Sequence, residues 1–93
     1  MGQYSLDLTD LAKKDLAEHR KSGDKQIAKR LTRIFEELAE TPYKGIGNPE
    51  PLKYEWSGYW SREINKKHRI VYSVNDETVT VLILSAKGHY GDK

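Results

Sequence analysis

Residues 25–42 read KQIAKRLTRIFEELAETP, and this stretch decides the fold. Its apolar residues recur at intervals of three and four, which places them on one face of an α-helix. They are Ile27, Leu31, Ile34, Phe35 and Leu38. Thr41-Pro42 ends the helix, because a residue before proline is driven out of helical geometry. A helix with such a continuous apolar face needs a second layer to cover it.

The N-terminal side of this stretch predicts a second helix and a strand. Gly23 can take the left-handed conformation that ends a helix, and Asp24 can cap the next helix. Thr9 is the expected N-cap of the first helix, whose apolar positions are Leu11, Ala12 and Leu16. Before it, Tyr4–Leu8 alternates apolar and polar residues, as a half-buried strand does.

The C-terminal side changes to the period of a sheet. Three or four strands are predicted, within Leu52–Trp56, Tyr59–Ile64, His68–Val74 and Thr78–Leu84. Ser57-Gly58 and Asn75-Asp76 supply turns, so neighbouring strands should be antiparallel. We therefore predict one α+β domain over residues 1–93, with an N-terminal strand and a two-helix hairpin packed on an antiparallel sheet.

Composition excludes several classes of protein. A chain of 93 residues is too short for two cores, and without cysteine it has neither disulfides nor a thiolate zinc site. The histidines His19, His68 and His89 lack the spacing of metal ligands, so we expect no metal and no cofactor. Gly45-Ile46-Gly47 lacks the remaining residues of a nucleotide-binding loop.

No secretory signal or membrane span is visible, so we expect a cytoplasmic protein. Charge is distributed unevenly along this chain of net charge +2. Residues 42–74 carry six Lys or Arg against three Glu, interleaved with aromatic residues. A basic and aromatic segment has the composition of a nucleic-acid surface, although a solvated sheet face would look similar.

RNA cleavage is one chemistry that this chain can support without a metal. The 2′-hydroxyl of RNA is a built-in nucleophile, so the protein need supply only a base, an acid and cations that stabilise the charged phosphorane. Glu50 lies between two prolines on a stiff backbone, as a positioned base requires. His89 or Tyr90 is a candidate acid, and the cation would come from Lys53, Arg62 or Arg69.

Arg69 is notable among these cations because it lies within an otherwise apolar strand. An arginine there is costly unless its guanidinium is paired or faces an anion. Each candidate also has an ordinary explanation. Glu50 and Arg69 can be surface charges at strand ends, His89 a terminal histidine without a role, and Lys53 and Arg62 decoration of an exposed face.

The motifs from Thr41 to Tyr72 closely resemble the YoeB/Txe branch of the RelE toxin superfamily. They are G-x-G-x-P-E-P-L-K, S-G-x-W-S-R and H-R-I-V-Y, with H-Y near the C-terminus. The resemblance covers nearly the whole chain. It implies a microbial RNase fold and cleavage of messenger RNA in the ribosomal A site. It also implies a cognate antitoxin of the YefM/Phd kind, and the toxin itself can be a monomer or a homodimer.

The resemblance also assigns roles to residues. Glu50 matches the general base, Arg69 the phosphate-stabilising arginine, His89 the general acid and Tyr90 the terminal aromatic of the site. The positions of Lys53 and Arg62 match those that help to hold RNA.

Two features depart from the family pattern. Glu63 stands where relatives often carry a second arginine, and Gly91-Asp92-Lys93 extends past the tyrosine at which many relatives end. Two alternatives remain open at this point. One is a ParE-like toxin that acts by binding rather than by cutting RNA, and the other is an RNA-binding domain without catalysis.

Overall fold

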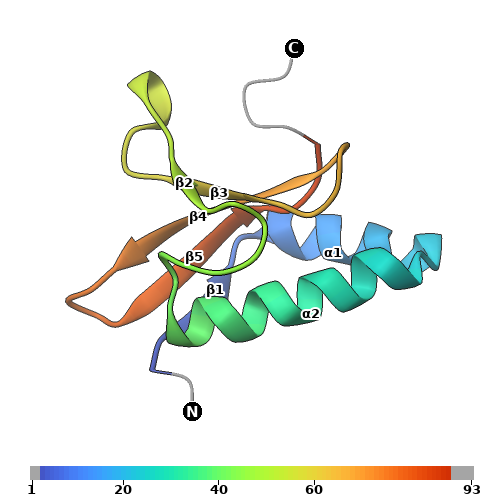
Figure 1. Cartoon of the computed structure of the whole chain (residues 1–93), viewed down its shortest axis with the longest axis horizontal. Helices are drawn as coiled ribbons and strands as arrows, with labels where there is room; N and C mark the ends of the chain where they lie inside the picture. Colours follow the sequence, from blue (N-terminus) through green and yellow to red (C-terminus); the bar gives the residue numbers. More distant parts are fainter. Residues whose placement is uncertain (1–2, 89–93) are drawn as a thin grey trace.

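The computed structural model describes residues 3–88 of the chain. Its elements run in the order strand, two helices, then a strand-rich second half (Figure 1). They are β1 (Ser5–Leu8), α1 (Asp10–Ser22), α2 (Lys25–Glu40), β2 (Glu50–Pro51), the 3-10 helix η1 (Tyr54–Trp56), β3 (Trp60–Glu63), β4 (Arg69–Asn75) and β5 (Thr80–Ser85). Both helices lie on one face of the sheet, so the α+β prediction is confirmed.

The helix ends form where the sequence predicts them. The hydroxyl of Thr9 accepts a hydrogen bond from the Ala12 N–H at 3.0 Å and caps α1. Gly23 ends α1 with a φ of 73°, and the Asp24 carboxylate caps α2 by accepting from the N–H groups of Gln26 and Ile27. These caps satisfy backbone donors that the first turn of a helix leaves without partners.

The sheet has five strands in the order β1-β5-β4-β3-β2. Neighbours from β2 to β5 are antiparallel, as predicted. β1 instead pairs with β5 in parallel, with Ser5 opposite Thr80 and Leu8 opposite Ile83. The sequence predicted β1 without its partner, because a parallel pair joins segments far apart in the chain and leaves no local turn signal.

The core lies between the helices and the sheet. Its buried residues come from α2 and from the inward positions of the strands, with a smaller part from α1. They include Ile27, Leu31, Ile34, Leu38, Ile70, Tyr72, Val81 and Ile83. Since successive strand residues point to opposite faces, the residues between them, such as Ser61, Arg69 and Val71, point to the face without helices. We call this second surface the open face.

The predicted strand Leu52–Trp56 is wrong over its whole length. β2 ends at Pro51, and the chain then turns through η1. Tyr54 has a φ of 60°, which a strand cannot accommodate, and the Trp56 N–H donates to the Lys53 carbonyl at 3.1 Å. Figure 1 shows this segment between β2 and β3 extending away from the helices. Alternation of residue types predicted a strand here, but the local hydrogen bonds close a tight turn.

Candidate active site

Glu50 lies on β2, the outermost strand of the sheet beside β3. It is directly opposite Ser61 on β3, and such cross-strand partners share a face of the sheet. Its side chain therefore reaches the open face, where 45% of its surface remains exposed. The flanking prolines Pro49 and Pro51 restrict the backbone, so the carboxylate starts from a stiff position.

Arg69 begins β4 and points to the same face. Its Nη1 lies 3.6 Å from Glu50 Oε1, an ion pair too long to be a hydrogen bond. Within residues 3–88, this buried Nη1 has no hydrogen-bond partner, and neither has the buried hydroxyl of Ser61. A guanidinium whose donor is buried and not yet used can bind an anion that enters the site.

The structure thus brings together two of the residues that the sequence singled out as candidates. Glu50 and Arg69 are 19 positions apart and sit on different strands, and β3 lies between these strands. A carboxylate beside an arginine can accept a proton while the arginine stabilises negative charge on a neighbouring phosphate.

Arg62 is not part of this surface. It points from β3 to the helix side, and its residue has no exposed area. Its guanidinium donates to Glu37 at 2.8 Å and to the hydroxyl of Tyr72 at 3.2 Å. It also donates to four backbone carbonyls of the loop after α2, those of Thr41, Pro42, Lys44 and Ile46. This burial contradicts the predicted direct contact of Arg62 with RNA, because the protein itself takes up the arginine's donors.

The loop that Arg62 binds leads directly to Glu50. Glu37 on α2 accepts the Ile46 N–H at 2.8 Å, so one carboxylate oxygen joins the loop to the arginine. Gly47 adopts a φ of 83°, and a Cβ there would lie 2.8 Å from the Glu63 carbonyl. Residues 45–47, which we call the glycine loop, therefore pack closely against β3 and the Arg62–Glu37 ion pair, and they lead into β2.

The remaining candidates lie in different surroundings. The Lys53 side chain is exposed just before η1. Glu63 lies directly opposite Arg69 on β3 and so adds negative charge to the open face. His89, Tyr90 and the 91–93 tail lie outside the described residues.

Several well-positioned polar groups were not found from the sequence. Glu37 lies in the last turn of α2, where a carboxylate is usually solvated, but it forms an ion pair with Arg62. Asp15 and His19 on α1 are almost fully buried, with exposures of 6% and 7%. Their spacing of four along one helix face was the available signal, since it places both on the side of Ala12, which the core buries.

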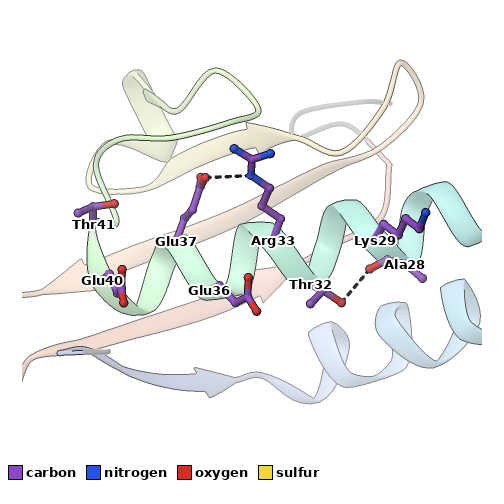
Figure 2. Close-up of a pocket in the computed structure, with 8 residues that line it drawn as sticks. All are labelled: Ala28, Lys29, Thr32, Arg33, Glu36, Glu37, Glu40 and Thr41. Atoms are coloured by element: carbon purple, nitrogen blue, oxygen red, sulfur yellow. Dashed lines mark hydrogen bonds and ion pairs between the residues drawn. The ribbon is translucent and has the colours of Figure 1, made fainter. Parts of the chain in front are cut away.

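A separate groove runs along the exposed side of α2 (Figure 2). Its residues are Ala28, Lys29, Thr32, Arg33, Glu36, Glu37, Glu40 and Thr41. Figure 2 shows Arg33 pointing toward Glu37, with which it forms an ion pair of 3.4 Å. None of the candidate residues on the open face lines this groove, so its shape does not bear on the Glu50–Arg69 pair.

Residues 3–88 contain neither a metal-binding cluster nor a membrane-spanning helix. No three His, Asp or Glu side chains in this range gather as a metal site would require. No helix in the same range combines the length and apolar character needed to cross a membrane.

Comparison with known proteins supports a specific family. Residues 9–90 match the family described as YoeB-like toxin of bacterial type II toxin-antitoxin system. Toxin RelK of Mycobacterium tuberculosis is 48% identical over 69 residues, which span 74% of this chain and 79% of that protein.

Solved structures agree over almost the whole chain. The YoeB dimer from Staphylococcus aureus is 31% identical with a TM-score of 0.78, and the match covers 95% of this chain and 99% of that chain. The heterotetrameric YoeB-YefM toxin-antitoxin complex from Staphylococcus aureus is 33% identical with a TM-score of 0.77, covering 94% and 98%.

Two helices packed on a five-stranded sheet form the α+β fold of YoeB/RelE-like toxins. Within this class, the chain belongs to the YoeB toxin family of bacterial type II toxin–antitoxin systems.

Proposed function

We propose that this toxin is an endoribonuclease that cleaves messenger RNA in the ribosomal A site and thereby inhibits translation. The observation that carries the proposal is the 3.6 Å approach of Arg69 Nη1 to the Glu50 carboxylate on an open face. A base and a cation at this separation can act on the same phosphodiester. The protein would act in the cytoplasm, where ribosomes and messenger RNA are found.

The reaction uses the RNA as its own nucleophile. Glu50 removes the proton of the 2′-hydroxyl, and the 2′ oxygen attacks the adjacent phosphorus. Arg69 stabilises the charge that collects on the phosphorane oxygens. The bond to the 5′ oxygen then breaks, and His89 supplies the proton that this leaving group takes up. The products are a 2′,3′-cyclic phosphate and a 5′-hydroxyl.

Further residues have supporting roles in this scheme. Tyr90 is the terminal aromatic residue of the proposed site. Lys53 binds the RNA backbone from its exposed position before η1. Arg62 acts through the protein rather than on RNA, because its buried guanidinium binds the loop that leads to Glu50.

The relatives indicate which partners to expect. One similar structure is a YoeB-YefM complex, and we propose an antitoxin of the YefM/Phd kind as the inhibitor of this toxin. Another is described as a YoeB dimer, which makes a homodimer the expected assembly of the isolated toxin.

The direct test is a cleavage assay on purified toxin with a defined messenger RNA, in the presence and absence of programmed ribosomes. Cuts at A-site codons that require ribosomes, with 5′-hydroxyl ends, are the expected result. A net charge of +2 provides little capture of flexible RNA, so naked RNA should be cut far more slowly. Intact messenger RNA together with DNA damage after induced expression would instead indicate a toxin that acts by binding.

A further inference from the structure

The backbone just beyond β5 is held by side chains of α1. The Asp15 carboxylate accepts the Ala86 N–H at 3.0 Å, and Nε2 of His19 lies 2.7 Å from the Ala86 carbonyl oxygen. Both polar groups of a single residue are thus bound by two side chains one helical turn apart. Asp15 and His19 are nearly buried and Ala86 has no exposed surface, so these hydrogen bonds are shielded from water.

Gly88 is held from the other side, by the start of β4. Nδ1 of His68 accepts the Gly88 N–H at 2.9 Å, and the Gly88 carbonyl accepts the Arg69 N–H at 2.8 Å. Between the two, Lys87 forms an ion pair with Glu18 of α1. Residues 86 and 88 are therefore fixed although β5 ends at Ser85.

The two histidines also contact each other. Their rings meet edge to face with centroids 4.9 Å apart, so α1 and β4 hold the segment jointly. Their hydrogen bonds define which nitrogens carry protons. Nδ1 of His68 accepts from an N–H and so carries no proton, whereas Nε2 of His19 faces a carbonyl and must carry one.

The fixed segment ends immediately before a candidate catalytic residue. Residue 89 comes directly after the fixed Gly88, and a general acid must be placed within hydrogen-bond reach of its leaving group. Because Arg69 contributes both its guanidinium to the open face and its N–H to Gly88, one residue links the anion site to this segment.

We propose that Asp15, His19 and His68 form a clamp on Ala86 and Gly88 that positions His89 for proton donation. The inference rests on the proposed nuclease function for its catalytic part. The three are positioning residues, since they act through the backbone and not on RNA. Protonation of His68 at Nδ1 would remove the acceptor for Gly88, so the clamp opens in acid.

Other charges near His68 affect that titration. The cavity beside it is lined by Glu18 and His19 from α1, by Asp24 from the turn between the helices, and by Lys66, Lys67 and Lys87. The lysines oppose protonation and the carboxylates favour it. The pH at which His68 is protonated and the clamp opens therefore depends on these neighbouring charges as well as on His68 itself.

Matched substitutions separate the hydrogen bonds from the bulk of the side chains. His68→Asn keeps an acceptor, Oδ1, near the position of Nδ1 but does not titrate, whereas His68→Leu removes the acceptor. Likewise His19→Gln keeps a donor near Nε2, and His19→Leu removes it. Asp15→Asn keeps an acceptor for Ala86, and Asp15→Ala does not.

The first measurement is amide hydrogen exchange at Ala86 and Gly88 by NMR, corrected for the intrinsic rate at each pH. Gly88 protection in the unsubstituted toxin should fall at least tenfold as His68 is protonated, and should stay constant in His68→Asn. This measurement requires neither cleavage activity nor a variant that lacks the hydrogen-bond acceptor. Gly88 protection that is unchanged in acid would overturn the clamp.

The second measurement is ribosome-dependent cleavage by the same proteins. His68→Leu should lower kcat by about tenfold or more with KM nearly unchanged, because a misplaced acid slows the chemical step and leaves RNA binding intact. His68→Asn should restore kcat and retain it at lower pH than the unsubstituted toxin. If His68→Asn is as slow as His68→Leu, the Nδ1 acceptor has no positioning role. A toxin that cleaves nothing would refute the nuclease function, while amide exchange still decides the clamp.

Discussion

The guanidinium of Arg62 lies 2.8 Å from the Glu37 carboxylate, and the arginine side chain has no exposed surface. This ion pair joins the last turn of α2 to β3 beneath the loop that leads to Glu50. Burial raises the pKa of Glu37, but the Ile46 N–H, Arg62 and Arg33 lower it by more, so the net pKa is below its ordinary value. The carboxylate is therefore charged in the folded protein. Through this charge Glu37 joins α2 to β3 and to the loop that contains Ile46.

Glu37→Gln should destabilise the protein by about 3 kcal/mol, because it leaves a buried arginine without its counter-charge. Glu36→Gln is the matched control, since Glu36 is the exposed neighbour on the same helix. Urea unfolding at neutral pH measures both. If Glu37→Gln lowers the free energy of unfolding no more than Glu36→Gln does, the backbone carbonyls alone are enough to stabilise the buried charge of Arg62.

The same carboxylate should make stability depend on pH in acid. A lowered folded pKa contributes stability that is present above the unfolded value of about 4.3 and is lost as pH falls through the folded pKa. The unfolding free energy should therefore decline below about pH 4.3 in the unsubstituted toxin. The decline should be smaller in Glu37→Gln, and urea titrations at several pH values provide the comparison.

Gly47→Ala should destabilise the toxin more than Gly23→Ala does. The two glycines have similar φ angles, 83° and 73°, so the conformational cost of alanine is alike, about 1 kcal/mol. A Cβ at Gly23 meets nothing within 4 Å, whereas at Gly47 it lies 2.8 Å from the Glu63 carbonyl. The difference in melting temperature between the two variants therefore measures the cost of the close contact between Cβ and the Glu63 carbonyl. Equal losses would mean that the glycine loop moves easily away from β3.

Local patterns predicted much of this fold, and long-range contacts account for the errors. The stripe of α2 and the caps at Thr9 and Asp24 are set by neighbours in the chain, so the sequence shows them. Arg62 was misinterpreted because its partner Glu37 lies 25 residues earlier on another element. The parallel pairing of β1 with β5 depends on the whole intervening chain.

The candidate site was partly predictable for the same reason. Glu50 was identified from its prolines and Arg69 from its apolar strand, which are local signals. Their mutual distance depends on the β2–β3 and β3–β4 registers, which no spacing rule fixes.

Glu50→Gln should abolish ribosome-dependent cleavage while the protein stays folded. A general base contributes roughly 10²- to 10⁴-fold to the rate, and glutamine cannot accept the proton. Glu55→Gln on the exposed η1 removes an equal charge and should leave the rate unchanged. Primer extension on ribosome-bound messenger RNA measures both. Retained cleavage in Glu50→Gln at equal protein level would exclude this residue as the base.

Arg69→Ala should reduce cleavage more than Lys53→Ala. Loss of one charged stabiliser of a developing oxyanion costs about 2.7–4 kcal/mol in the transition state, whereas an exposed phosphate contact mainly alters affinity. The first variant should therefore lower kcat, and the second should raise KM. Single-turnover kinetics on programmed ribosomes separate the two parameters. A larger kcat loss for Lys53→Ala would place the anionic centre nearer the glycine loop.

Truncation after Tyr90 should leave toxicity nearly intact, because the three final residues contribute no side chain to the proposed chemistry. Truncation after Gly88 removes His89 and Tyr90 and should eliminate toxicity. It should change the melting temperature little, since β5 ends at Ser85, and the clamp and the residues that it holds, Ala86 and Gly88, are retained. Growth assays with matched expression and melting curves on both proteins test this. A toxin that remains active without residues 89 and 90 would require another general acid. His68, which lies beside Gly88, would then be the next candidate for that role.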